Sequence, residues 1–330
     1  MDITRLLDGG RAVLAPMAGY TDRAFRLLCA KHGAALTCTE MISARAMTYG
    51  DRRTALLCDT EEGDPPTAVQ LFGHDPEVVA GAVVMLAPRA AAIDLNMGCP
   101  APKIVSNGDG CALMRDLPLA GRIIEAAVKA SPVPVTVKLR LGWDEGHKNA
   151  AELARLAESL GAAAIYVHGR TRERMYRPPV DLDGIAEVRQ AVSIPVVANG
   201  DIFSPGAALD TVRATGCRSV MIGRGALGDP FIFARIRAAL ENAEFREPTA
   251  QERFDAAREH MTLMARLKDE RIAMLQARKH IVHYFGGIRG AAALRIRANA
   301  MHTLGDALEL LDAAQEIAQD TQGGGEDGRA

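Results

Sequence analysis

The chain has 330 residues, 48% of them hydrophobic and 24% charged, so it can bury a large core in one big domain or in a big domain and a small one. Its formal net charge of −2 gives no overall signal for nucleic acid or for a membrane. No apolar run approaches the roughly 18 residues of a membrane helix, and the start of the chain lacks the pattern of a signal peptide, so we expect a cytoplasmic protein that contacts no membrane.

Short apolar runs alternate with longer helical patterns through the first part of the chain. The runs are uninterrupted, which is typical of strands covered by helices on both faces. We predict eight strands, at Ala12–Met17, Leu36–Glu40, Ala68–Phe72, Ala91–Asn96, Val133–Leu139, Ala163–His168, Ile194–Asn199 and Ser219–Gly223. Predicted helices between them include Asp22–His32, Leu119–Ala130, Asn149–Leu160, Leu182–Ala191 and Pro205–Thr215. Eight β-α units over about 230 residues predict a (β/α)₈ TIM barrel, with a doubly wound open sheet as the alternative.

After Leu240 the pattern becomes purely helical. A polar stretch over Asn242–Pro248 leads to Thr249-Ala250-Gln251-Glu252, which is a capping box that starts a helix. Gly286-Gly287 and Gly290 break the region that follows into separate helices. We therefore predict a barrel domain at residues 1–241, an all-helical domain at 242–320 and a disordered tail at 321–330.

The helical region carries an uneven charge. Between residues 271 and 305 there is no Asp or Glu, and the basic residues are Arg271, Arg278, Lys279, Arg289, Arg295 and Arg297. On a chain that is otherwise acidic, such a segment attracts polyanions. The alternative is a solvated helix surface that happens to be positive.

The six cysteines show no spacing typical of a metal site or a redox pair. In a long chain without a secretory signal, disulfides are not expected either. We predict free thiols, most of them small core residues, and no bound metal.

In a barrel of this kind the chemistry collects at the C-terminal ends of the strands. Polar residues within or directly after the predicted strands are Glu40, Gln70, Asn96 with Cys99, Lys138 with Arg140, His168, Asn199 and Arg224. Several inward-facing polar groups on one rim need partners, and a polar ligand can supply them.

Two glycine-rich loops, Asn199-Gly200-Asp201 and Gly223-Arg224-Gly225, precede predicted helices. Their backbone N–H groups, a helix dipole and the Arg224 side chain are suited to a phosphate. Gly223 to Gly228 also matches G-x-G-x-x-G, but no βαβ unit follows it, which disfavours a dinucleotide-binding fold.

A phosphate site with a lysine, a glutamine and an asparagine around one barrel mouth suits FMN. Lys138 would stabilise negative charge on the reduced ring, while Gln70 and Asn96 would hydrogen-bond to its polar edges. An aldolase could use the same lysine as a Schiff base, but it would leave Cys99 unexplained.

Four motifs resemble those of the tRNA-dihydrouridine synthases, in the expected order along the chain. They are Ala15-Pro16-Met17-Ala18-Gly19-Tyr20-Thr21-Asp22, Asp94-Leu95-Asn96-Met97-Gly98-Cys99-Pro100, His168-Gly169-Arg170-Thr171-Arg172 and Asn199-Gly200-Asp201-Ile202. The form Cys-Pro-Ala-Pro-Lys at 99–103 resembles the bacterial B-type branch.

The resemblance implies an FMN-binding barrel with a helical tRNA-binding domain, which uses NADPH to reduce the C5–C6 bond of particular tRNA uridines. It implies that Cys99 is the general acid that delivers a proton to C5, and that FMN contacts Pro16, Met17, Ala18, Gln70, Lys138, His168, Asn199, Gly200, Asp201, Gly223 and Arg224. We expect a monomer whose RNA contacts come from the six basic helical residues together with Lys103, Arg170 and Arg172.

The sequence departs from the family pattern at Leu182, where a tryptophan is usual, and at Asp109, where a small residue is usual. It also lacks the glycine that is usual near Pro178 or Pro179. These departures concern RNA binding rather than the flavin site. Two other functions remain open at this point: an FMN-dependent barrel acting on a small molecule such as a free pyrimidine or enone, and a non-catalytic RNA-binding protein.

Overall fold

The structure is a computed structural model that describes residues 2–51, 54 and 56–323. Within these residues one parallel sheet runs in the order β1-β9-β8-β7-β6-β5-β4-β2. The strands are β1 (Ala12–Leu14), β2 (Thr37–Cys38), β4 (Thr67–Phe72), β5 (Ala92–Met97), β6 (Val135–Arg140), β7 (Ala164–His168), β8 (Val196–Asn199) and β9 (Ser219–Ile222). Backbone hydrogen bonds from Leu14 N to Leu36 O (2.9 Å) and from Ala35 N to Ala12 O (3.0 Å) join the two end strands, so the sheet closes into the predicted barrel.

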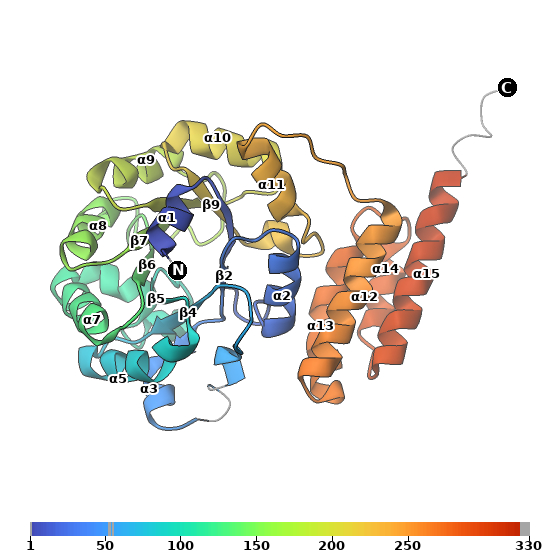
Figure 1. Ribbon diagram of the computed structural model, residues 1–330, viewed down its shortest axis with the longest axis horizontal. Helices are drawn as coiled ribbons and strands as arrows, with labels where there is room; N and C mark the ends of the chain where they lie inside the picture. The colour runs from blue at the N-terminus through green and yellow to red at the C-terminus, as the bar shows by residue number, and fades with distance from the viewer. Residues whose placement is uncertain (1, 52–53, 55, 324–330) are drawn as a thin grey trace.

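Helices surround the barrel and cover the outer faces of the strands (Figure 1). They are α2 (Arg23–Lys31), α3 (Ala44–Thr48), α5 (Pro76–Leu86), α7 (Leu117–Ala130), α8 (Ala150–Ser159), α9 (Leu182–Ala191), α10 (Pro205–Thr215) and α11 (Ile232–Leu240). Each predicted strand and each named helix is present to within a few residues, whereas α3, α5, α11 and the short strand β3 (Ile42–Ser43) were not named in the prediction. Gly216 ends α10 in the left-handed conformation at φ 68°.

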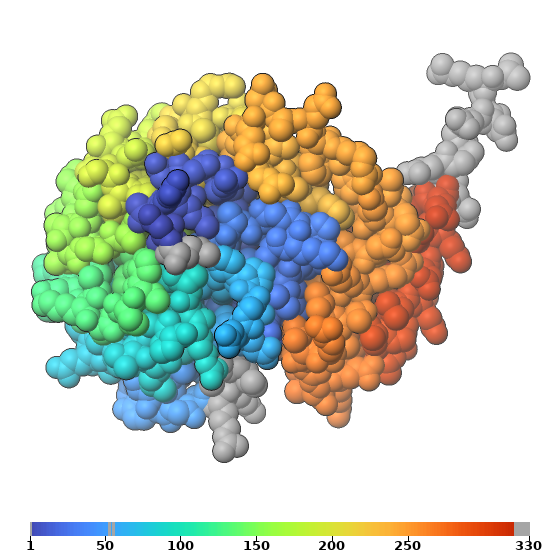
Figure 2. Space-filling view, in the orientation of Figure 1, coloured from blue at the N-terminus to red at the C-terminus, as the bar shows by residue number. Residues whose placement is uncertain are grey.

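The N-terminal helix α1 (Ile3–Asp8) closes one end of the barrel. Its buried Ile3 and Leu7 pack with Val13, Tyr166 and Met221 from the inner faces of the strands. Figure 1 shows α1 over the centre of the ring, and Figure 2 shows N-terminal residues filling this face. The opposite end, where the strands have their carboxyl termini, is therefore the end that can hold a ligand.

The last helices form a separate bundle beside α2, as Figure 1 shows. They are α12 (Ala250–Leu267), α13 (Glu270–Ile281), α14 (Ala291–Ala298) and α15 (Leu304–Gly323). The capping box is present, with Thr249 and Glu252 each bonded to the other's backbone N–H, and Gly290 precedes α14 at φ 77°. Residues 321–323 belong to α15 and are not the start of a tail, while 324–330 lie outside the described residues. No helix among the described residues is both long and apolar enough to cross a membrane.

A polar cluster lies between α2 and the helical bundle. The Asp22 carboxylate caps α2 by accepting from Phe25 N (3.0 Å) and also accepts from Lys268 Nζ (2.6 Å). Burial alone would raise the pKa of Asp22, but Lys268 and two nearby histidines lower it to about 2. Those histidines, His260 and His280, offer atoms within 4.8 Å of each other and of the carboxylate. The Lys268 ammonium neutralises the carboxylate. The cluster is therefore a charge-balanced polar contact between α2 and the helical bundle.

Replacing Lys268 with Met is expected to lower the free energy of unfolding by about 3–5 kcal/mol, because Asp22 would remain as a buried charge without its partner. Lys31 provides the matched control, since it also bridges the barrel to the bundle, through Glu259 (2.7 Å), but its side chain is 58% exposed. Lys31→Met should cost at most about 1 kcal/mol. Urea unfolding of both variants checks this, and equal effects would contradict the interface assigned to Asp22 and Lys268.

Candidate active site

A cavity of about 410 Å³ opens at the carboxyl ends of the strands. This volume lies within the roughly 300–1,000 Å³ of ordinary small-molecule sites. The residues predicted for the cofactor and for acid catalysis all line it: Pro16, Met17, Ala18, Gln70, Asn96, Cys99, Lys138, His168, Asn199, Gly200, Asp201, Gly223 and Arg224. The fold thus brings together side chains that are up to 208 positions apart in the sequence (Pro16 to Arg224). That each one contacts a cofactor remains a prediction.

Cys99 lies on the loop that follows β5. Its backbone N–H donates to Asn96 Oδ1 (2.9 Å), and Arg140 Nε donates to the carbonyl of the preceding Gly98 (3.0 Å). A Cβ at Gly98 would lie 3.1 Å from the Leu139 carbonyl carbon, so a larger residue would crowd the backbone of β6. Of the six cysteines, all within the described residues, five are buried and Cys99 is partly exposed. Burial raises the pKa of the Cys99 thiol, which therefore stays protonated at neutral pH and is fitted to donate a proton.

Lys138 reaches the cavity from β6. Its Nζ donates to Asn199 Oδ1 (3.2 Å), and the Asn199 amide in turn donates to Met221 O (2.8 Å). Burial, with the charge of nearby Arg140, lowers the pKa of Lys138 to about 8, although Asp94 acts in the opposite direction. At neutral pH the lysine therefore remains mostly protonated, and it supplies the cavity with a positive charge.

His168 ends β7 and is held neutral. Burial lowers its pKa far below the usual range, and Arg140, Lys138 and Arg170 add to the effect. Its Nε2 lies 3.2 Å from Arg170 Nη1. Because a guanidinium only donates, Nε2 must be the acceptor and Nδ1 must carry the proton. His168 is thus an N–H donor at the cavity.

Arg170 was predicted to contact RNA, and its position contradicts this. The side chain is fully buried, pairs with Asp201 and donates through Nε to Arg177 O (2.8 Å). Asp201 also accepts from Arg224 Nη2 (2.9 Å), so its carboxylate is shared between two arginines. Arg170 fixes the loops after β7 and β8 and is not available to a phosphate.

The two glycine loops lie at the cavity, but no α-helix among the described residues begins directly after either of them. Helix α10 begins at Pro205, capped by Ser204, and α11 begins only at Ile232. Only the three-residue 3₁₀ helix Arg224–Ala226 starts directly after Gly223. Backbone N–H groups and the half-exposed Arg224 side chain are therefore what these loops offer an anion.

The structure assigns tasks to residues for which the sequence predicted no contact with a ligand. Arg140, which follows Lys138 by two positions on β6, bonds to Gly98 O and also to Thr171 O (3.1 Å) and Met175 O (2.7 Å), so it ties two cavity loops together. Its place at a strand end was a usable signal. Tyr176 and Phe203 are 54% and 52% exposed at the cavity rim, with the Arg224 guanidinium over both rings. Loop aromatics of this kind have no sequence period that could reveal them.

The other predicted RNA contacts are spread over two regions. Lys103 is exposed on α6 (Pro102–Val105), directly after the Cys99 loop, and Arg172 packs on the Trp143 ring at 4.7 Å. Lys279 lies over the Tyr20 ring at 5.3 Å, close to the cavity, and Arg278 donates to Met301 O. Exposed arginines on the bundle, for which the described residues provide no recorded ion pair, are Arg271, Arg289, Arg295 and Arg297.

The protein is a parallel barrel with one cavity at the carboxyl ends of its strands. A protonated thiol, a lysine, a neutral histidine and glycine loops surround this cavity. These features define a TIM-barrel enzyme. Sequence comparison then specifies the family: the family model for dihydrouridine synthase (Dus) matches residues 13–320, and the chain belongs to this enzyme family.

Three curated relatives illustrate the similarity. The chain is 42% identical over 293 residues to a probable tRNA-dihydrouridine synthase of Rickettsia bellii, covering 88% of this chain and 90% of the relative. It is 40% identical over 294 residues to tRNA-dihydrouridine synthase B of Pseudomonas aeruginosa, covering 88% of each protein. It is 43% identical over 276 residues to tRNA-dihydrouridine synthase B of Shewanella oneidensis, covering 82% of this chain and 85% of the relative. The family resemblance drawn from the four motifs is confirmed.

Proposed function

We propose that this protein reduces uridines of tRNA to 5,6-dihydrouridine, with FMN as cofactor, NADPH as electron donor and Cys99 as the acid. Membership in the family and the names of the relatives support the reaction. The observation that carries the residue assignment is the cavity itself, where a protonated thiol, a lysine and two glycine loops meet.

The cavity fits FMN by its chemistry. Backbone amides of the loops after β8 and β9, with Arg224, would hold the phosphate, while Lys138, Gln70 and His168 offer polar groups for the ring. Bound and reduced FMN would supply the hydride for C6 of the uracil. Cys99 would supply the proton for C5, since its thiol is held by a fixed loop and is protonated at neutral pH.

An FMN-dependent barrel acting on a free pyrimidine is the second candidate, and it shares all the cavity residues. The exposed arginines of the helical bundle favour tRNA, because a small substrate has no use for them. The test is to incubate the purified protein with FMN, NADPH and either unmodified tRNA transcript or free uridine. Dihydrouridine in the transcript at a much higher rate supports the proposal, and preferential reduction of free uridine contradicts it.

The reaction rate is expected to fall as pH rises through about 8. Lys138 has a folded-state pKa of about 8 and loses its charge there, whereas the raised pKa of Cys99 keeps the thiol protonated to higher pH. In Lys138→Arg the charge persists, so the decline near pH 8 should disappear even if the plateau is lower. Single-turnover rates across the pH range check this, and an unchanged decline in the variant would remove Lys138 as its origin.

A further inference from the structure

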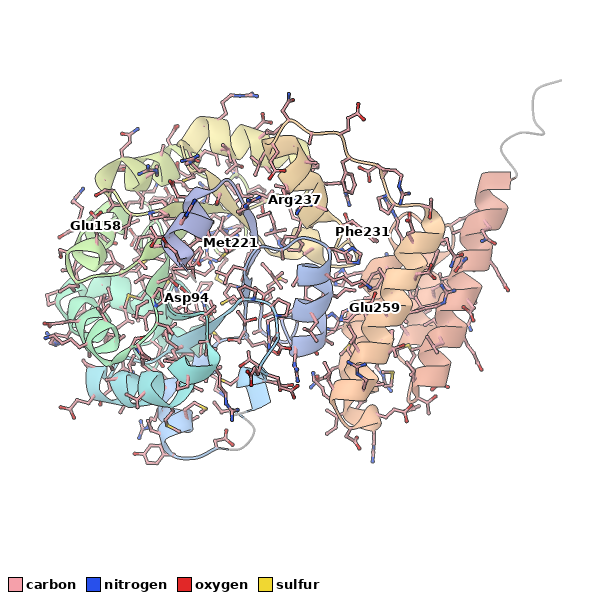
Figure 3. The ribbon with its side chains drawn as sticks, viewed as in Figure 1. Asp94, Glu158, Met221, Phe231, Arg237 and Glu259 are labelled. Atoms are coloured by element: carbon pink, nitrogen blue, oxygen red, sulfur yellow. The ribbon has the colours of Figure 1, made fainter. Side chains whose placement is uncertain are left out.

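A buried carboxylate lies beneath the cavity on the strand that leads to Cys99. Asp94 is 0% exposed, and Figure 3 shows it inside the barrel. Its Oδ2 accepts from Gln70 Nε2 (2.7 Å) and its Oδ1 from Thr136 Oγ1 (2.8 Å). Burial raises the pKa of Asp94 to about 6, with Gln70, Thr136 and Lys138 acting in the opposite direction, so the group is mostly ionised at neutral pH.

The hydrogen bonds continue from Asp94 toward the Cys99 loop in one direction. Gln70 Oε1 accepts from Asn96 Nδ2 (2.9 Å), and Asn96 Oδ1 accepts from Gly98 N (3.2 Å) and Cys99 N (2.9 Å). Donors and acceptors therefore alternate from the carboxylate to the backbone of the cysteine.

The ionised carboxylate sets this direction, because it only accepts hydrogen bonds. The donor end of the Gln70 amide must face Asp94, which leaves its oxygen for Asn96. The Asn96 oxygen is then the end that faces the two backbone N–H groups. If either amide were reversed, an N–H would meet an N–H and the loop would lose its anchor.

We propose that Asp94 is a positioning residue that fixes the loop carrying Cys99 through the amides of Gln70 and Asn96. This inference rests on the proposed role of Cys99 as the acid. Asp94 touches no cavity surface, so its effect reaches the reaction only through the geometry of the loop. The same network occupies both ends of the Asn96 amide within the protein, which gives Asn96 a structural task besides any contact with a cofactor.

Two substitutions distinguish this positioning role from a role in which Asp94 only fills space in the barrel interior. Asp94→Leu has nearly the same shape but no acceptor, so the Gln70 amide is free to turn. Asp94→Asn retains an acceptor for Gln70 Nε2 and presents its amide N–H to Thr136, so the direction of the network is kept. Cys217→Ala changes a buried core residue that lies outside the network, and it serves as the control.

The first readout is the alkylation rate of Cys99 by iodoacetamide, since Cys99 is the partly exposed cysteine and the other five are buried. The second is the rate of dihydrouridine formation, with kcat and KM separated and FMN content measured. Asp94→Leu should speed alkylation several-fold and lower kcat per bound FMN by about 10- to 100-fold, with KM unchanged. Asp94→Asn and Cys217→Ala should match the wild type in both.

A folded Asp94→Leu protein with wild-type alkylation and kcat would overturn the proposal, and so would an Asp94→Asn protein as impaired as Asp94→Leu. If Asp94→Leu does not fold, Asp94→Ala carries the same expectation. If the wild-type protein forms no dihydrouridine, the proposed function fails, while the alkylation rates still decide whether Asp94 holds the loop.

Discussion

Cys99→Ala is expected to slow uridine reduction by about 10²- to 10⁴-fold, the usual contribution of a positioned general acid. FMN binding and reduction of the flavin by NADPH should be unchanged, because the backbone groups that hold the loop remain and other residues line the rest of the cavity. Stopped-flow absorbance separates the two half-reactions.

Two further variants sharpen this result. Cys99→Ser should stay impaired, since a hydroxyl is a much weaker acid than a thiol of the same shape. Cys217→Ala removes a cysteine that is buried in the core and should leave both half-reactions intact. A Cys99→Ala protein that reduces tRNA at the wild-type rate would show that another group or water delivers the proton.

Removing positive charge from the helical bundle is expected to weaken the binding of RNA strongly. We assume that each side chain contacts one phosphate. A fourfold Arg→Gln variant should then weaken tRNA binding by roughly 10²- to 10³-fold. It should also reduce the slope of the logarithm of the association constant against the logarithm of the salt concentration by about 3. The substituted residues are Arg271, Arg289, Arg295 and Arg297. Filter binding of tRNA over a range of salt concentrations measures both quantities.

The matched control removes the same charge from exposed positions on the barrel helices α7, α8 and α10, of which Figure 1 shows α7 and α8 on the side away from the bundle. Its substituted residues are Arg122, Lys129, Arg155 and Arg213. The control should bind tRNA nearly as the wild type does. Equal losses in the two variants would mean that only overall charge matters and that the bundle is no specific RNA surface.

The barrel could be predicted from the sequence because its strands are buried on both faces and appear as continuous apolar runs. The runs at Ala91–Asn96 and Ala163–His168 coincide closely with β5 and β7. Strand β3 was missed because Ile42-Ser43 is too short to form a pattern, and its pairing with β4 is a tertiary contact. Helix α5 was also missed, although Asp75 and Pro76 form a cap and first turn that the sequence displays.

The cavity residues could be predicted because the carboxyl ends of all barrel strands meet at one rim. A polar residue that follows an apolar run must therefore lie at this rim. Arg170 could not be assigned in this way. Its burial depends on Asp201, 31 positions later, which the neighbouring strand β8 brings alongside. A sequence shows that an arginine follows a strand, but not whether its partner is a carboxylate of the protein or a phosphate of a ligand.

The most direct test of the proposed function is the dihydrouridine content of tRNA, measured by mass spectrometry in a strain that lacks this gene and in the same strain carrying the wild-type gene or Cys99→Ala. We expect at least one tRNA position to carry uridine instead of dihydrouridine in the deletion strain. The wild-type gene should restore dihydrouridine at this position, and Cys99→Ala should not. Unchanged dihydrouridine at every position of every tRNA in the deletion strain would contradict the proposed function.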